Sequence, residues 1–414
     1  MQKVHALVVA TDDALPRPIQ PTRPRIARTN KLSVLYSIVF SASIVTEPLK
    51  AYVSEPLPWQ LVSMTHNTST LSFEDYVNTT ATYLATKYNT HTLSPSTVFS
   101  HDKVTNSALL RYTMALPSNA DESCTTHVIY FPGSIFYGFG TVEFVCQFLA
   151  QNASTQLTNL KAMCQHNRMA GLLFSESCTW FESSGTRGTF WVYHAVQIVE
   201  SIMWSWAKLG FRCALSCFIG IQLWQLYFCH YGPLLKNLCT IGLNHADGRV
   251  YEVDVGDPTW LILSHPIVCI AMVVDIHYSM AYFAIAGYRV CQMHDLWQFA
   301  VGSFAGSNMV WASYTTMRFS SLLIKNLQWE KYFAPVDPGL MALTAALYAG
   351  PLFYIICQTP IVLLFEYLIQ VCVPGSAKRE SLEVLPGMLS FLLMFASVPL
   401  MTAYLQNCFL RRRE

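Results

Sequence analysis

Long uncharged apolar stretches constrain the fold of this chain more than any other feature. Six of them follow one another near 189–206, 213–231, 259–286, 297–317, 339–371 and 384–410, and a shorter one precedes them at 32–46. About 20 apolar residues let an α-helix cross the hydrocarbon core of a bilayer, and a helix satisfies its own backbone hydrogen bonds there. We therefore expect an α-helical polytopic membrane protein, with residues 189–414 forming its helical membrane bundle.

The composition excludes several other classes of protein. Only 12% of the 414 residues are charged, whereas a soluble protein carries about 25%. A hydrophobic content of 52% excludes disorder over most of the chain. A net charge of +1 gives no electrostatic reason to expect a nucleic-acid partner. The expected partners are the lipid bilayer and a protein ligand on the extracellular or lumenal side, and the oligomeric state stays open.

The N-terminal region combines a basic tail with a short apolar segment. Residues 1–31 are rich in Pro and Arg, which predicts a disordered cytosolic tail. Residues 32–46 are uncharged, and we interpret them as a signal-anchor transmembrane helix. A signal peptide cleaved near Ser43 is the alternative, although its basic leader would be long. In both cases the chain that follows enters the lumen.

Residues 47–188 predict a small α+β domain in the lumen or outside the cell. All three glycosylation sequons fall here, at Asn67, Asn78 and Asn152. Ser72 begins a capping-box pattern that predicts a helix over roughly 73–88. Short strands are expected at 107–116, 127–131 and 171–174, and one or two helices within 140–165. The expected localisation is a multi-pass protein of the secretory pathway or plasma membrane.

Two membrane topologies fit the apolar pattern. Either all seven stretches cross, or 189–206 lies in the outer interface and six cross. The second arrangement leaves more Lys and Arg on the cytosolic side and agrees better with the positive-inside rule. It also gives a location to His194, Gln197, Glu200, Ser201 and Lys208, which would form the polar side of an interfacial helix.

The thirteen cysteines divide between the two regions. Four lie in the expected lumenal domain, namely Cys124, Cys146, Cys164 and Cys178, and an oxidising compartment permits two disulfide bonds with three connectivities. The other nine are scattered along apolar segments, where cysteine acts as a small hydrophobic residue. No CxxC pair is present, so we expect no structural zinc site.

Three ionisable residues within apolar stretches are candidates for a functional site: Asp275, His277 and Glu366. Charged side chains are costly inside a bilayer and usually serve a purpose there. Asp275 and His277 are two residues apart and so point to different faces of a helix. Asp275 is therefore either a structural hydrogen-bonding group or part of a transport path. Pro351 and Pro360 in the same stretch as Glu366 predict a kinked helix.

Two further motifs predict packing rather than chemistry. Gly302 and Gly306 form a GxxxG pattern that lets two helices approach closely, more plausibly within the chain than between chains. Residues 249–259 alternate apolar and acidic side chains and then turn, which predicts a short strand. The acids of this loop, Glu252, Asp254 and Asp257, are interpreted as a solvated turn, with a divalent-cation site as the less favoured alternative.

No nucleotide-binding loop, nucleophile elbow or zinc-protease motif occurs, and we expect no cofactor and no metal. Three hypotheses of function remain. The first is a surface or endomembrane protein that binds a ligand through a glycosylated domain while the helices anchor it. The second is a transporter or channel that uses Asp275. The third is a membrane-embedded transferase with Glu74 and Asp75 as acids. The first is preferred, and an enzymatic role is the less favoured interpretation.

Overall fold

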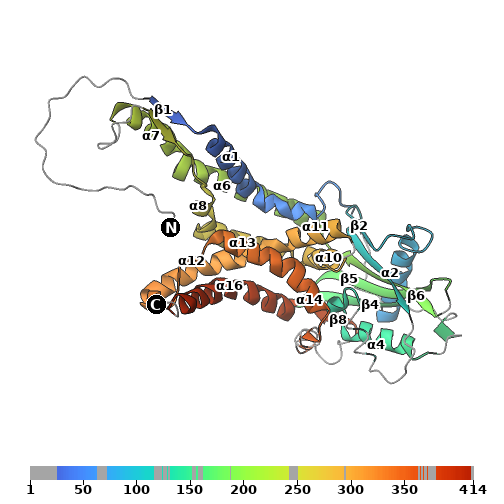
Figure 1. Ribbon diagram of the computed structural model, residues 1–414. Coiled ribbons are helices and arrows are strands. Elements are labelled where there is room, and N and C mark those ends of the chain that lie inside the picture. The colour runs from blue at the N-terminus through green and yellow to red at the C-terminus, as the bar shows by residue number, and fades with distance from the viewer. Residues whose placement is uncertain are drawn as a thin grey trace, which may run out of the picture. The chain divides into compact units, whose positions relative to one another are not determined.

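The computed structural model describes residues 26–411 except for 63–71, 116–123, 125–127, 129–130, 152–154, 157–161, 187, 242–249, 293–294, 362–363, 365–366, 368–370 and 372–378. It is mostly helical, with a sheet region (Figure 1). The chain forms two compact units. The first contains residues up to 42 together with 221–259, and the second contains 43–220 together with 260–414.

The first unit joins two segments that are far apart in the sequence. Strand β1 (Ile26–Thr29) pairs in parallel with β7 (Val250–Val253), and the Asn30 amide donates to Asp254 Oδ1 at 2.9 Å. Helix α7 (Cys229–Thr240) packs beside β1. The strand predicted in the 249–259 loop is thus confirmed. By contrast, residues 26–29 are a strand rather than part of a disordered tail, because a distant partner supplies their backbone hydrogen bonds.

The second unit contains a six-stranded sheet in the order β2-β3-β6-β5-β4-β8. The strands are β2 (Phe99–Asp102), β3 (Ser107–Ala115), β4 (Ala162–Met169), β5 (Leu172–Ser183), β6 (Thr189–Ile198) and β8 (Ser381–Glu383). All neighbours are antiparallel except β8, which runs parallel to β4. The strands predicted at 107–116 and 171–174 correspond to β3 and the start of β5, whereas most of 127–131 lies outside the described residues.

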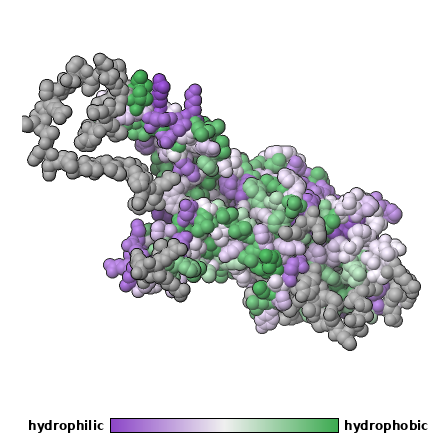
Figure 2. Space-filling model, in the orientation of Figure 1, coloured by the Kyte–Doolittle hydropathy of each residue, from purple (hydrophilic) through white to green (hydrophobic). Residues whose placement is uncertain are grey.

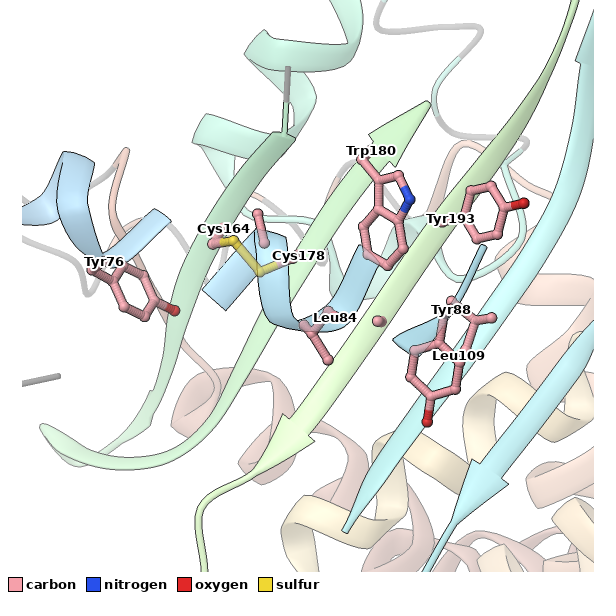
Figure 3. Close-up of a cluster of buried hydrophobic side chains, with 10 residues drawn as sticks. Tyr76, Leu84, Tyr88, Leu109, Cys164, Cys178, Trp180 and Tyr193 are labelled. Carbon is pink, nitrogen blue, oxygen red and sulfur yellow. A yellow bond between two sulfur atoms is a disulfide. The ribbon is translucent and has the colours of Figure 1, made fainter. Parts of the chain in front are cut away.

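Helices cover both faces of this sheet. Helix α2 (Phe73–Lys87) packs on one face, and the Ser72 hydroxyl accepts the backbone N–H of Asp75 at its start, as the capping box predicts. Figure 3 shows the buried side chains on this face, where Trp180 stacks on Tyr193 with ring centroids 5.2 Å apart. Helices α4 (Phe139–Leu149) and α10 (Met280–Val290) cover the opposite face.

The sequence prediction for 189–206 is wrong in its secondary structure. Thr189–Ile198 is the fully paired strand β6, and the helix α6 (Ile202–Leu223) begins only after it. The residues predicted as one polar helical flank are therefore split, with His194 and Gln197 on the strand and Lys208 on the helix. A central strand with both faces covered is apolar throughout and does not alternate, so its pattern resembles that of a buried helix. The sheet consequently extends beyond residue 188.

The remaining helices follow the apolar stretches, with several breaks. They are the 3-10 helix η1 (Glu47–Val53), α8 (Thr259–Leu263), α9 (Pro266–Tyr278), α11 (Leu296–Gly306), α12 (Val310–Asn326), α13 (Pro338–Leu347), α14 (Phe353–Cys357) and α16 (Leu385–Arg411). A π-helical turn, Tyr348–Leu352, contains Pro351 and joins α13 to α14. In Figure 1 the sheet lies at one end of the second unit, and α12, α13 and α16 run together away from it.

Four helices among the described residues are long and apolar enough to cross a membrane. They are Lys31–Val53, Ile202–Thr240, Gly339–Cys357 and Leu385–Phe409. The first of them combines α1 (Lys31–Thr46) with η1. The pair α9–α10 meets the same criteria together but bends by 73° and forms either a broken span or a re-entrant loop. The predicted span 297–317 corresponds to α11 and α12, which are not among the four.

The surface of these helices is unusually apolar. Helix α16 alone exposes Leu389, Leu393, Met401, Leu405 and Phe409. On the face drawn in Figure 2, hydrophobic residues gather over the helices of the second unit. Such an extended apolar surface needs a non-aqueous environment, and together with the four helices it indicates a membrane protein.

Two cysteine pairs lie at disulfide distance. Cys124 and Cys146 have Cα atoms 5.6 Å apart, and Cys164 and Cys178 have theirs 4.0 Å apart on neighbouring strands β4 and β5. This is one of the three connectivities that the sequence allowed. Disulfide bonds persist in oxidising compartments, and the two pairs are typical of proteins that fold there.

Candidate functional site

The candidate site is a cluster of five ionisable side chains buried in the second unit. This charge cluster consists of Glu55, Glu200, Lys208, Arg212 and Asp275. Glu55 follows η1, Glu200 lies between β6 and α6, Lys208 and Arg212 are one turn apart on α6, and Asp275 is on α9. Segments from four parts of the chain therefore meet through charged groups.

Arg212 is the central member of the charge cluster, and its side chain is fully buried. Its two terminal nitrogens donate to the two oxygens of Glu55, each at 2.8 Å. Its Nε donates to Asp275 Oδ1 at 2.7 Å, and one terminal nitrogen also reaches Ser279 Oγ at 2.7 Å. This planar fork gives bidentate recognition of a carboxylate, which a lysine could not reproduce.

Lys208 connects the charge cluster to the sheet. Its Nζ donates to Glu55 Oε2 and to Glu200 Oε2, each at 2.9 Å. The Tyr282 hydroxyl also donates to Glu200 Oε2 at 2.8 Å and accepts from the amide of Asn106, just before β3. The network thus fixes α6, α9 and α10 to the edge of the sheet.

The charge cluster holds three carboxylates and only two cations. Burial by itself would raise the pKa of the Glu55 carboxyl, but the charges and hydrogen bonds of Lys208 and Arg212 lower it to about 2. Glu55 is therefore ionised. With every member ionised the five side chains sum to one negative charge, and the nearby ammonium of Lys103, which interacts electrostatically with Glu55, offsets it.

A pocket opens beside the charge cluster, and we call it the acidic pocket. Its lining includes Glu55, Asp275, Ser54 and Asn308 beside more numerous apolar residues, and its free volume is about 40 Å³. Ser54 Oγ and Asn308 Oδ1 are buried and have no hydrogen-bond partner among the described residues. Ser54 is only 4% exposed. Unpaired buried polar atoms are costly, so they mark this pocket as a place where a polar ligand group would be stabilised.

Two of the three intramembrane candidates predicted from sequence, Asp275 and His277, do not come together. Asp275 belongs to the charge cluster, and it is paired with Arg212 rather than isolated. His277, two residues further along α9, is exposed and lies outside the cluster. Glu366 lies outside the described residues.

The other predicted site residues are structural or lie at the surface. Asn78 is exposed on α2, and Asn67 and Asn152 lie outside the described residues. A Cβ added at Gly302 would stand 2.7 Å from the carbonyl oxygen of Ala286, and one at Gly306 would stand 3.0 Å from Ala349 Cβ. Both glycines therefore allow close packing within the chain.

Sequence reasoning missed four of the five members of the charge cluster as site residues. Lys208 is predicted on the polar side of an interfacial helix, and Arg212 falls between the apolar stretches 189–206 and 213–231. Their spacing of four residues in an otherwise apolar helix was the signal that could have identified them, because it puts both on one helical face. Glu55 and Glu200 carry no such signal, since they lie at the ends of elements.

A second buried polar group lies inside the sheet region. The imidazole of His194 pairs with Thr179 Oγ1 through Nδ1 and with the Tyr288 hydroxyl through Nε2, both at 2.8 Å. Burial lowers the pKa of His194 to about 3, so the ring is neutral at physiological pH. The two hydrogen bonds hold the ring between β5 and α10, and we interpret it as structural.

Among the described residues, no group of three or more His, Cys, Asp or Glu is placed to hold a metal ion. No protein-family model matches the chain, and no curated protein or solved structure matches it either.

Proposed function

We propose that this chain is a multi-pass protein of the secretory pathway or plasma membrane that binds a ligand on its lumenal or extracellular side. The sheet region would lie on that side, anchored through the helix at 31–53 and carrying glycans at its sequons. The disulfide pairs support this assignment, as does the exposed position of Asn78.

Two strand pairings support the topology with six crossings. The pairing of β1 with β7 requires both to lie on one side of the membrane, so two spans separate them, namely 31–53 and 202–240. The pairing of β8 with β4 likewise requires an even number of spans between residues 198 and 381. An additional crossing at 189–206 would put β1 and β7 on opposite sides of the membrane, so they could not pair. Strand β6 already occupies most of that stretch.

The second condition also constrains the two helical pairs between residues 266 and 326. The spans 202–240 and 339–357 already make two crossings. The pairs α9–α10 and α11–α12 therefore either both cross or both fail to cross. Both alternatives put the C-terminus in the cytosol, as the positive-inside rule also prefers. We favour two crossings, because the six crossings that result match the number expected from the apolar stretches.

The pairing of Asp275 is the observation that favours a binding role. Its carboxylate is held by Arg212, which is also locked to Glu55, so the charge cluster acts as a rigid clamp between the helices and the sheet. A proton carrier must change its charge state during each cycle, and such a clamp opposes that change. A firmly held sheet region with a pocket at its base is suited to binding.

Transport is the second candidate, because Asp275 and Glu55 line the acidic pocket. No comparable feature favours a transferase. Glu74 and Asp75 lie in the first turn of α2, and Asp75 caps that turn with Ser72. Neither of these acids lines the acidic pocket.

A flux assay distinguishes binding from transport. Purified protein is reconstituted into proteoliposomes loaded with a pH-sensitive dye, and proton and sodium gradients are applied. We expect no flux above that of protein-free vesicles, and Asp275→Asn should behave like the wild type. A flux that Asp275→Asn abolishes while folding persists would refute the binding role.

Glycan mapping tests the side of the membrane. Removal of N-glycans should increase gel mobility, and Asn78→Gln should remove one glycan. Insertion of a new sequon next to Glu330, in the loop assigned to the cytosol, should add none. Glycosylation of that inserted site would contradict the proposed topology.

A further inference from the structure

Two cysteines outside the disulfide pairs lie together where α10 meets α14. Cys291 directly follows α10, and Cys357 is the last residue of α14. Both belong to one hydrophobic cluster, which also contains Val290 and Phe353. Their thiols are hydrogen-bonded to each other. Two thiols in contact can undergo a reaction that a single buried cysteine cannot, namely intramolecular disulfide formation.

The packing of the two helices explains this contact. A Cβ added at Gly287 would stand only 3.4 Å from Cε1 of Phe353, so α10 and α14 approach each other closely there. The backbone N–H of Cys291 bonds to the carbonyl oxygen of Gly287, and Cys357 follows Phe353 by the same spacing. One helical turn therefore leads from the first contact to the second on both helices. The backbones of two helices thus hold the two cysteines together.

The surroundings of the two cysteines include the sheet region that carries the other pairs. The Cys291 thiol also hydrogen-bonds with the backbone of Gly133. Gly133 lies in the segment between Cys124 and Cys146, which are themselves at disulfide distance. An environment that oxidises Cys124 and Cys146 therefore also surrounds the chain that Cys291 contacts.

We propose that Cys291 and Cys357 form a third disulfide bond, made by exchange with the disulfide of a lumenal thiol–disulfide oxidoreductase. Cys291 is partly exposed, whereas Cys357 is only 4% exposed, so the thiolate of Cys291 attacks first. This step joins Cys291 to one sulfur of the oxidoreductase and releases the other sulfur as a thiolate. Cys357 then attacks Sγ of Cys291, and the oxidoreductase leaves as a dithiol. The two cysteines lose two protons and two electrons, which the oxidoreductase takes up.

The third bond joins a membrane helix to the sheet region. It ties the end of the candidate span Gly339–Cys357 to α10, which packs on the sheet. It also encloses α11, α12 and α13 in one covalent loop. Closing a long loop restricts the unfolded chain and so stabilises the folded protein. This inference rests on the lumenal placement of the sheet region that we propose, but it does not depend on a ligand.

The first experiment uses the unmodified full-length protein. Cells are lysed directly into sodium dodecyl sulfate with N-ethylmaleimide, and the purified protein is digested without reductant and mapped by mass spectrometry. We expect the peptides of Cys291 and Cys357 to be linked to each other in the majority of molecules. Alkylation of both cysteines in molecules whose other two pairs are linked would overturn the proposal and leave the lumenal placement intact. Alkylation of all three pairs would overturn both.

Alanine variants test whether the bond stabilises the helices. Cys291→Ala, Cys357→Ala and the double variant should lower the thermal unfolding midpoint by about the same amount, because each removes the whole bond. Cys269→Ala is the matched control, since Cys269 is also a buried free cysteine on an apolar helix, and it should leave the linkage unchanged. Losses that add up in the double variant would indicate packing alone and overturn the proposal. If a variant fails to fold, the linkage in the unmodified protein decides.

Discussion

Removal of the Arg212 side chain should destabilise the protein more than any other single change in the charge cluster. In Arg212→Leu, Glu55 loses two charge-assisted hydrogen bonds and Asp275 loses one, while Ser279 loses the fourth bond that the guanidinium makes. Their side chains are only 1% and 5% exposed, so water does not replace the lost partner. Breaking a buried ion pair by deleting one member costs about 3–5 kcal/mol. That loss is a large share of a typical stability of 5–15 kcal/mol.

Two companion variants separate charge from geometry. Arg212→Lys keeps the positive charge but offers one ammonium in place of the fork, so it should lose about 1.5–3 kcal/mol for each hydrogen bond not remade. Adding Glu55→Gln and Asp275→Asn to Arg212→Leu removes the stranded charges and should recover part of the stability. Unfolding in mixed micelles of nonionic detergent and sodium dodecyl sulfate, followed by tryptophan fluorescence, measures all four proteins.

The result that would refute this reasoning is specific. If Arg212→Leu lowers the unfolding free energy by less than about 1 kcal/mol, the charge cluster does not hold the helices to the sheet. If the triple variant is less stable than Arg212→Leu, the penalty does not arise from stranded carboxylates. Either outcome would also remove the main argument against transport through Asp275.

Three further predictions concern the packing, the pH response and the covalent bonds. Gly302→Ala should lower the unfolding free energy by about 1–3 kcal/mol, because the added methyl group crowds α10. Gly210 has open space around it, so Gly210→Ala should raise the unfolding free energy by about 0.5–1 kcal/mol. A gain at both positions in the same unfolding assay would contradict the packing. In the folded protein the pKa of His194 is about 3, below its ordinary value of 6.5. The neutral ring therefore contributes fully to stability above pH 6.5. That contribution is lost as the pH falls towards 3, by up to about 1.4 kcal/mol per pH unit. His194→Gln should flatten that acid limb of the stability curve, and an unchanged limb would assign it to other groups. Non-reducing peptide mapping should find Cys164 linked to Cys178, and replacing both by Ser should cost about 2–4 kcal/mol; recovery of both cysteines as free thiols would contradict the pairing.

Local patterns allowed correct predictions wherever the determinants of structure lie close together in the sequence. The apolar stretches identified most of the helices, the Ser72 pattern located the start of α2, and the alternation after residue 249 located β7. The same reasoning failed at β6, because helices on both faces of the sheet remove the alternation that normally identifies a strand. It also failed at β1 and β8, whose pairing partners lie more than 200 residues away along the chain.

The candidate site was predictable only in part. An acid in an apolar stretch drew attention to Asp275, but nothing local indicates that Arg212 and Glu55 are its neighbours. Glu55 lies in a segment that was assigned to a soluble domain, and its burial depends on how three distant elements pack. Tertiary packing brings the five charges together and leaves Ser54 Oγ and Asn308 Oδ1 without partners among the described residues, and no local sequence pattern indicates either result.

The short strand β8 determines when the sheet can be completed during synthesis. It covers the edge of β4, and Glu383 accepts the backbone N–H groups of Ala170 and Gly171 at the turn between β4 and β5. At a translation rate of about 5–20 residues per second, β8 emerges roughly 10–40 s after β6. During that interval β4 presents an open edge able to pair with another chain. Chains truncated before residue 381 should therefore keep this edge open and associate with one another more readily than the full-length chain.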